Sequence, residues 1–247
     1  MSEVTIGRRA FLQVALGSAG ALVIGLRSAQ AQQYPVDFPA ELLGDDVTTL
    51  GPFLRIERDG RVIIGASGCE VGQGVMSDLP MLIAEELDVA WMQVRLIQLP
   101  YGYIDGQSGP DNRYGDQSTD SELAINLLRD DLRRAGALAR WLLVQAAANE
   151  WSLDRTSLAS AKGQVIAPDG RRLSYGALAR SAAALPAPTS AIELKAQARW
   201  SLIGQPTPMA EGRELVTGHS RFGSDHFRAE LAYAVVLRCP YPDGTLQ

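Results

Sequence analysis

The sequence is poor in the residues that define several classes of protein. It has two cysteines and two histidines in 247 residues, which excludes a disulfide framework and any four-cysteine zinc or iron–sulfur site. Lysine and arginine total 23 against 28 aspartate and glutamate, and the net charge of -5 argues against a nucleic-acid partner. Because 46% of its residues are hydrophobic, the chain can still bury an ordinary globular core.

Long apolar runs are also missing. The uncharged stretch Val14–Leu26 is shorter than the roughly 20 residues that a membrane-spanning helix needs. It follows the pair Arg8-Arg9 and precedes the small-residue triplet at 29–31, which is the order found in signal peptides. We therefore expect residues 1–31 to be a twin-arginine signal peptide that directs export to the periplasm. A buried core helix is the alternative interpretation.

Turn residues divide the remaining chain into elements. Residues 32–52 include Pro35 and Pro39 and show no sustained period, which predicts an extended lead-in. Apolar runs on both sides of the Asp-Gly turns at 59–60 and 169–170 predict two β-hairpins. A strand is predicted over residues 94–99.

The apolar series over 75–87 has helical spacing. Because Pro80 fits best in a first turn, Ser77 or Asp78 is the expected cap of this helix. A long helix is predicted to start at the polar run 118–121, to bend at Gly136 and to end near residue 150, and a short helix is predicted over 175–184.

The acidic pairs at 85–86 and 130–131 fall within these helical stretches, so solvated faces are expected for them.

A change to a β-rich composition places a domain boundary near Pro208. Cys69 and Cys239 could pair after export, but their separation in sequence predicts no proximity. Cys69 is better explained as a small residue packed beneath a loop.

The best candidate site is Gly72-Gln73-Gly74, between a predicted strand and a predicted helix. Glycines let backbone N–H groups approach an anion at a helix start. The series is not a dinucleotide fingerprint, because Ser77 stands where the third glycine would be, and no lysine follows to make a phosphate-binding loop. On spacing alone a tight structural turn explains the glycines. The Gln73 amide, which can donate and accept hydrogen bonds, favours a ligand.

Several segments taken together resemble one family. They are Phe53-Leu54-Arg55-Ile56, Glu70-Val71-Gly72-Gln73-Gly74-Val75, Ala84-Glu85-Glu86-Leu87-Asp88, Leu132-Arg133-Arg134-Ala135-Gly136-Ala137, Arg171-Arg172-Leu173-Ser174-Tyr175-Gly176-Ala177-Leu178-Ala179 and Leu202-Ile203-Gly204-Gln205-Pro206. In combination they resemble the molybdopterin-binding large subunits of the xanthine dehydrogenase and aldehyde oxidase family, and most of all its isoquinoline 1-oxidoreductase β-subunit type. The stretch from Val216 to Pro240 resembles the opening of the family's α/β-hammerhead domain.

This resemblance implies an α+β fold. A molybdopterin-binding lobe of mixed sheet and helix is expected over 53–207, and the start of a hammerhead domain over 208–247. Cofactor contacts are implied for Gly72, Gln73 and Gly74, and more weakly for Ser118 and Thr119. The expected cofactor is molybdopterin with molybdenum, in its cytosine dinucleotide form. No residue of this chain is matched to a metal ligand or to the family's glutamate base.

The resemblance also implies the chemistry and the partners of such a subunit. The family oxidises aldehydes or hydroxylates N-heterocycles, and electrons leave through an iron–sulfur small subunit and a cytochrome c, which could associate the complex with the membrane. The remainder of the large subunit is an expected partner as well, because family members continue for several hundred residues beyond the segment that matches Gln247. The isolated chain is expected to be inactive.

The chain departs from the family pattern at two places. The stretch Gly115-Asp116-Gln117-Ser118-Thr119-Asp120-Ser121 carries acidic residues that sit awkwardly beside an anionic cofactor. The part of the family's chain that holds most of the cofactor cradle has no counterpart here. A non-catalytic exported scaffold or interaction module, which keeps the fold without the cofactor, is therefore the alternative function.

Overall fold

The computed structural model describes residues 53–68, 70–99 and 123–240, together with three short strand segments before them. Those segments are β1 (Val14–Leu16), β2 (Leu22–Ile24) and β3 (Val47–Thr49). Apart from β1 and β2, the predicted signal peptide lies outside the described residues, as does most of the predicted lead-in. The chain divides into two units, Met1–Ala210 and Glu211–Gln247.

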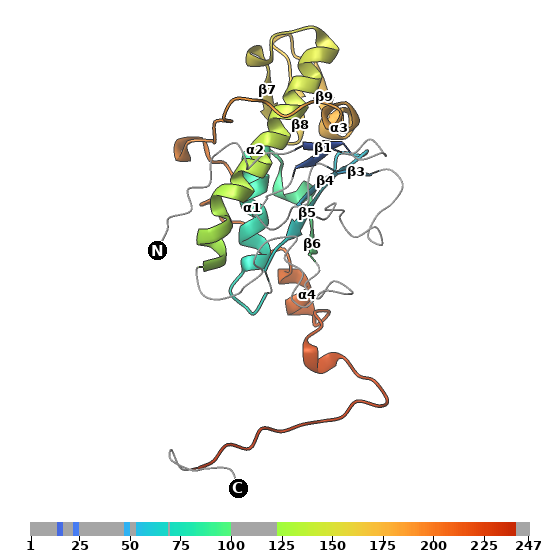
Figure 1. Ribbon diagram of the computed structural model, residues 1–247, viewed down its shortest axis with the longest axis vertical. Coiled ribbons are helices and arrows are strands. Elements are labelled where there is room, and N and C mark those ends of the chain that lie inside the picture. Colours follow the sequence, from blue (N-terminus) through green and yellow to red (C-terminus); the bar gives the residue numbers. More distant parts are fainter. Residues whose placement is uncertain are drawn as a thin grey trace. The chain divides into compact units, whose positions relative to one another are not determined.

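The central sheet of the first unit has the strand order β3-β4-β5-β6 (Figure 1). Strands β4 (Leu54–Glu57) and β5 (Val62–Ala66) form the first predicted hairpin, in which Leu54 pairs with Ile64. The backbone N–H of Arg61 donates to the Asp59 carboxylate at 2.9 Å across the turn. Strand β6 (Val94–Gln98) was also expected, and it pairs with β5 in the parallel direction.

Helix α1 (Val75–Leu87) connects β5 to β6, and the short helix η3 (Trp91–Gln93) precedes β6. The parallel pairing of β5 and β6 requires such a crossover. Every residue of β5 is buried, as expected for a strand inside a sheet that is covered by a helix. The strand–loop–helix order expected around residues 72–74 is therefore confirmed.

Helix α1 begins earlier than predicted. Its N-cap is Gly74, with φ 87°, and the side chain of Ser77 accepts a hydrogen bond from the N–H of Ala210 at 2.9 Å instead of capping the helix. Pro80 lies within the helix, beyond the first turn, so the expectation that Ser77 or Asp78 caps α1 is wrong. A proline has no N–H to donate to the carbonyl four residues earlier, and this one hydrogen bond of the helix is lost.

Helix α2 (Leu123–Trp151) lies alongside α1 (Figure 1). It is continuous through Gly136, and the bend expected there stays a prediction. A Cβ at residue 136 would lie 2.4 Å from the carbonyl oxygen of Ile83. The missing side chain lets the backbones of α1 and α2 approach each other closely, and Leu138 and Leu142 of α2 are fully buried in the same core.

A second, three-stranded sheet has the order β7-β8-β9. It comprises β7 (Ala159–Ala161), β8 (Gln164–Ile166) and β9 (Arg172–Ser174), and the short helix η4 (Arg155–Ser157) precedes it. The pairing of β8 with β9 confirms the second predicted hairpin. Helix α3 (Tyr175–Ala183) follows as expected, with the Ser174 side chain accepting from the N–H of Ala177 at 3.2 Å.

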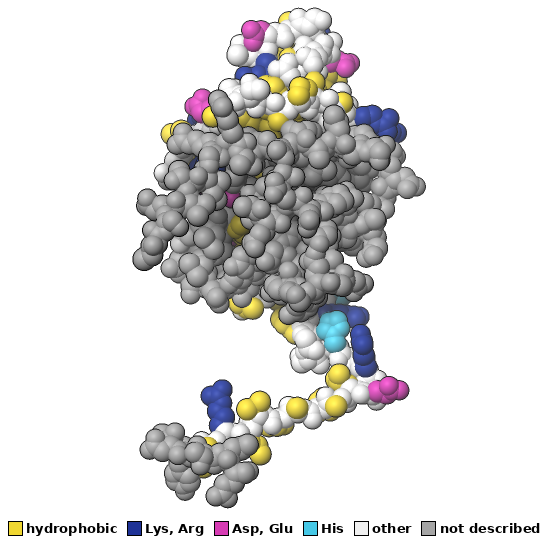
Figure 2. Space-filling view, in the orientation of Figure 1, with side chains coloured by type: hydrophobic (Ala, Val, Ile, Leu, Met, Phe, Trp, Pro, Cys, Tyr) yellow, Lys and Arg dark blue, Asp and Glu magenta, His cyan; other side chains and the backbone are white. Residues whose placement is uncertain are grey.

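The second unit contains α4 (Gly212–Thr217) and η6 (Gly223–Asp225), while η5 (Gln197–Arg199) belongs to the first. Residues 226–240 form no strand in the structure. Figure 2 shows hydrophobic side chains spaced along this extended part, and the exposed ones include Phe227, Tyr233 and Leu237. A strand needs a partner to satisfy its backbone, and the described part of the unit offers none. The α+β fold is confirmed, whereas the hammerhead stays a prediction.

None of the described helices combines the length and the apolar character needed to cross a bilayer.

Candidate functional site

The loop between β5 and α1 is exposed at its apex. Val71, Gly72 and Gln73 are all exposed, while Val75, Met76 and Ser77 at the start of the following helix are buried. Gly72 and Gly74 have φ angles of 103° and 87°. Residues other than glycine adopt such backbone angles only with steric strain. A Cβ at Gly72 would meet nothing within 4 Å, so the backbone conformation is what requires glycine at this position.

Glu70 folds back into this loop. One oxygen of its carboxylate accepts hydrogen bonds from the N–H groups of Gly72 at 2.8 Å and Gly74 at 2.9 Å. The other oxygen accepts from the N–H of Met76 at 3.0 Å. The carboxylate thus satisfies N–H groups at the start of α1, where the helix dipole favours a negative charge.

These contacts determine the ionisation of two acidic residues. Burial opposes the charged form of Glu70, but the hydrogen bonds from the N–H groups of Gly74, Met76, Gly72 and Gln73 outweigh it, so the pKa of Glu70 is lowered. Burial and the charge of Glu70 raise the pKa of Asp78, in the first turn of α1. Two carboxylates therefore face the amide groups for which the sequence suggested an anionic ligand.

Gln73 has a defined orientation. Its side-chain oxygen Oε1 accepts from the N–H of Val71 at 2.7 Å. This hydrogen bond fixes the plane of the carboxamide relative to the loop backbone. The arrangement places an oriented polar side chain at the exposed apex of the loop.

Ser67 lies at the end of β5, directly before the loop. It is 1% exposed, and among the described residues its hydroxyl has no hydrogen-bond partner. Buried polar groups without partners are rare in folded proteins. The Ser67 hydroxyl is such a group, and it lies where β5 leads into the loop.

Other residues singled out in the sequence are less informative. Ser118, Thr119 and Cys69 lie outside the described residues, so their proposed roles stay predictions. Cys239 is exposed and unpaired. Within the described part of the chain, no group of three or more His, Cys, Asp and Glu side chains is arranged to hold a metal ion.

The acidic pair Glu85-Glu86 was expected on a solvated face, and this expectation is wrong. Both residues are buried, with 1% and 0% exposed. Glu85 lies 3.0 Å from the Lys195 ammonium and accepts from the N–H of Leu202 at 2.7 Å. Glu86 binds Arg133 at 2.7 Å. Cations and N–H groups from distant segments stabilise these charges, which a helical pattern alone does not reveal.

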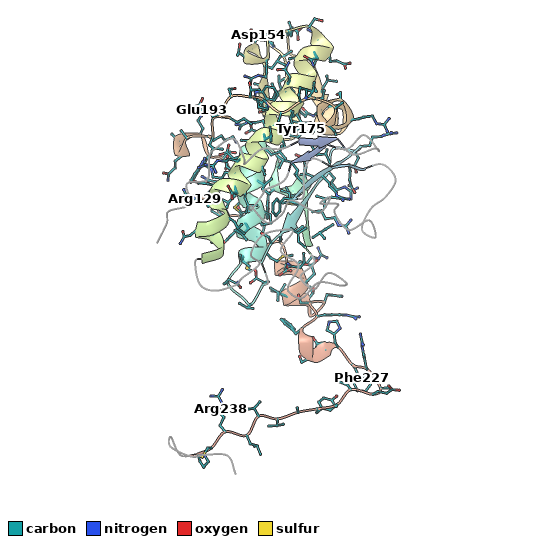
Figure 3. All side chains as sticks on the ribbon, viewed as in Figure 1. Arg129, Asp154, Tyr175, Glu193, Phe227 and Arg238 are labelled. Atoms are coloured by element: carbon teal, nitrogen blue, oxygen red, sulfur yellow. The ribbon has the colours of Figure 1, made fainter. Side chains whose placement is uncertain are left out.

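The carboxyl end of α1 is a junction of several elements. Asp88, in a left-handed conformation with φ 59°, lies 3.5 Å from Arg140 and accepts from the Ser160 hydroxyl at 2.5 Å. The Tyr175 hydroxyl donates to the carbonyl of Leu87 at 2.7 Å, and burial raises the pKa of this tyrosine. Figure 3 labels Tyr175 at the start of α3. These contacts hold the second sheet and α3 to α1, and their role is structural.

Sequence reasoning overlooked Glu70 as a residue with its own role. The signal was present, because an acidic residue stands just before two glycines at the start of a helix, where its carboxylate can reach the first N–H groups. No local pattern identified Lys195, whose side-chain partners Glu85 and Asp88 are more than 100 residues away in sequence.

Comparison with known proteins gives three relatives. The chain is 33% identical over 221 residues to the beta subunit of isoquinoline 1-oxidoreductase from Brevundimonas diminuta, a match that covers 76% of this chain and 28% of that protein. It is 26% identical to the membrane-bound aldehyde dehydrogenase [pyrroloquinoline-quinone] of Gluconacetobacter polyoxogenes, with coverages of 70% and 21%. It is 27% identical to a nicotinate dehydrogenase subunit from Pseudomonas putida, with coverages of 78% and 15%.

The chain thus spans between 15% and 28% of the length of these relatives. No family model matches it. Among solved structures, quinoline 2-oxidoreductase from Pseudomonas putida 86 aligns with a TM-score of 0.40 and 20% identity, over 52% of this chain and 15% of that one. On its similarity to the sequence relatives, the chain belongs to the molybdenum hydroxylase family, where it corresponds to an amino-terminal portion of a molybdopterin-binding large subunit of the isoquinoline 1-oxidoreductase β-subunit type.

Proposed function

We propose that this chain is part of a molybdenum hydroxylase that oxidises an aldehyde or hydroxylates an N-heterocycle. The names of the three relatives support this substrate class, because two refer to N-heterocycles and one to an aldehyde. The observation that carries the proposal is the oriented amide of Gln73 at the exposed loop between β5 and α1. We assign the cofactor contact to this loop.

The residues of the loop fit the implied cofactor through Gln73. A side-chain amide carries both N–H donors and an oxygen acceptor, groups that suit the polar atoms of such a cofactor. The N–H groups of Gly72 and Gly74 fit less well, because they already donate to Glu70. When bound, molybdopterin with molybdenum supplies the two-electron oxidation of the substrate carbon. The role of this chain in that reaction is to hold and orient the cofactor.

The proposal extends to the partners and the location of the protein. Two relatives are named as subunits, and an iron–sulfur small subunit, the remainder of the large subunit and a cytochrome c are the proposed partners here. The cytosine dinucleotide form of the cofactor is proposed with them. Export by the twin-arginine route, after cofactor insertion, is proposed from Arg8-Arg9 and the small residues that follow the apolar stretch.

One observation favours the alternative, a non-catalytic exported module. Glu70 already satisfies N–H groups at the start of α1, so the loop is a stable turn without any ligand. The two functions differ in what the loop does in the assembled complex, and they can be separated by measuring the cofactor itself.

The experiment compares three variants in the complex of this chain with the rest of its large subunit and the small subunit. Gln73→Ala removes one hydrogen-bonding amide, whose bonds to a charged ligand are worth about 1.5–3 kcal/mol. Gly72→Ala imposes a strain of about 1–2 kcal/mol from its positive φ. Gly60→Ala is the matched control, because it has a φ of 89° and the same open space but lies in the hairpin turn.

Molybdenum content and melting temperature (Tm) are then measured for each purified complex. We expect Gly72→Ala and Gly60→Ala to lower Tm alike, and only the two loop variants, Gln73→Ala and Gly72→Ala, to lower molybdenum content. Unchanged molybdenum in a stable Gln73→Ala complex would refute the cofactor contact. An intact wild-type complex without molybdenum would favour the non-catalytic module.

A further inference from the structure

We propose that Glu70 is the resident anion of the β5–α1 loop and the residue that positions Gln73. A ligand at this loop then meets the side chain of Gln73, and not the backbone N–H groups of the two glycines. The identity of the ligand rests on the proposed function, whereas the position of Glu70 does not.

The hydrogen bonds of Glu70 form one connected set. Its carboxylate oxygens accept from the N–H groups of Gly72, Gly74 and Met76 at 2.8, 2.9 and 3.0 Å. Such charge-assisted bonds are among the stronger hydrogen bonds in proteins. Because both oxygens are engaged, the carboxylate fixes the loop on both sides of Gln73.

The conformation of the glycines follows from this arrangement. Their positive φ angles turn successive N–H groups toward a common concave side, as in other anion-binding loops. Here the anion on that side is Glu70. The residue between the glycines, Gln73, projects from the exposed side, and the N–H of Val71 holds its amide oxygen at 2.7 Å.

The electrostatics disfavour a second anion in the same place. Glu70 is held in its charged form by the N–H groups around it. Asp78 also faces this region, since its carboxylate would lie 3.9 Å from a Cβ at Gly74. An incoming phosphate would have to displace one carboxylate and approach another, and like charges at such distances repel.

The first test measures the backbone amides of the full chain by NMR at neutral pH. Glu70→Gln removes the charge but keeps the size of the side chain, so the amide proton signals of Gly72 and Gly74 are expected to move upfield. Asp154→Asn is the matched control. Asp154 also accepts from a backbone N–H, that of Thr156 at 2.7 Å, but it lies just beyond the carboxyl end of α2 (Figure 3). Glycine amides that do not move in Glu70→Gln would overturn the proposal.

The second test uses inorganic phosphate as a probe of the amide groups. In the wild-type chain we expect millimolar phosphate to leave the signals of Gly72 and Gly74 in place, because Glu70 occupies the N–H groups. In Glu70→Ala the same titration is expected to move both signals. Phosphate-dependent shifts in the wild type would show that a free anion replaces Glu70, which contradicts the proposal.

The third test asks whether Glu70 acts through Gln73 in the complex. Glu70→Gln is expected to lower the affinity for molybdopterin about tenfold, with partial rescue by Glu70→Asp. The double variant Glu70→Gln/Gln73→Ala should bind no more weakly than Gln73→Ala alone, because a positioning residue and the residue it positions are not independent. Additive losses would overturn the positioning role. If the wild-type complex holds no molybdenum, the proposed function fails, and the two NMR tests still decide the position of Glu70.

Discussion

The Lys195 ammonium lies 3.0 Å from the carboxylate of Glu85, and both side chains are buried. Lys195 also donates to the Glu85 carbonyl and to Asp88, and its own backbone N–H donates to Glu86 at 3.1 Å. A segment without regular secondary structure is thereby fastened to the carboxyl end of α1. Since buried charges are stable only when they are paired, the core of the first unit depends on this lysine.

Replacing Lys195 with methionine should destabilise the chain strongly. The substitution keeps the length of the side chain but leaves Glu85 and Asp88 without their shared cation, and breaking a buried pair costs about 3–5 kcal/mol. Urea unfolding measures the free energy. Arg199→Met is the control, because Arg199 lies 3.7 Å from Glu193 with both side chains exposed, and such pairs contribute at most about 1 kcal/mol. Equal effects of the two substitutions would contradict this view of the buried pair.

The free energy of unfolding should decrease as the pH is lowered, and part of this decrease should depend on Glu85. Burial alone would raise its pKa, but the N–H groups of Leu202 and Ile203 and the Lys195 ammonium outweigh burial, so the pKa is lowered from 4.5. A carboxyl with a lowered pKa contributes stability that is fully present above its unfolded pKa and is lost as pH falls through the folded value.

Unfolding free energies measured from pH 6 down to pH 3 test this expectation. The wild type should lose stability below a pH of about 4.5, and Glu85→Gln should be less stable at pH 6 and flatter below it. Glu193→Gln, which changes an exposed carboxylate, should keep the wild-type slope. A Glu85→Gln curve parallel to the wild type would rule out this role.

Gly136→Ala should destabilise the chain although alanine favours helices. Alanine gains about 1 kcal/mol over glycine in a helix interior, but the new Cβ would lie 2.4 Å from the Ile83 carbonyl oxygen. Overpacking of this kind costs about 1–3 kcal/mol, and backbone cannot move aside as a side chain can. We expect a lower urea midpoint for Gly136→Ala and no change for Gly223→Ala, where an added Cβ meets nothing within 4 Å. A stabilised Gly136→Ala chain would mean that α1 and α2 can separate freely.

Ser67→Ala should leave the stability unchanged or raise it. The hydroxyl is buried without a partner in the described structure, and burial of such a group costs about 1–3 kcal/mol in proteins. Alanine removes the polar atom and loses no hydrogen bond. Thermal unfolding of the apo chain, with Ser201→Ala as an ordinary serine control, measures the effect. A clearly lowered Tm would indicate that the hydroxyl has a partner.

Local patterns predicted much of the fold. The hairpin of β4 and β5 followed from an Asp-Gly turn between apolar runs, and α2 followed from its helical spacing. The predicted start of α1 was too late, because the expectation that Pro80 lies in the first turn was given more weight than Gly74 as a cap. Gly74 begins the helix and Pro80 is tolerated inside it, since the contacts of a buried helix compensate for one missing hydrogen bond.

The candidate site was only partly predictable. The position of Gly72, Gln73 and Gly74 between a strand and a helix could be inferred from the sequence. An acidic residue just before the glycines was a signal for Glu70, but which N–H groups its carboxylate accepts from depends on the path of the side chain. The burial of Glu85 and Glu86 depends on Lys195 and Arg133, which lie far away along the chain. Contacts between distant segments leave no periodic trace in a sequence.

The same tie between Glu85 and Lys195 has a consequence for synthesis on the ribosome. The two residues are 110 positions apart, so at about 5–20 residues per second α1 emerges roughly 5–20 s before its cation. Until then α1 cannot bury its carboxyl end without an unpaired charge. We expect nascent chains that end before residue 195 to remain sensitive to protease over residues 75–87, and longer ones to become resistant, so that the first unit closes only once most of the chain has been made.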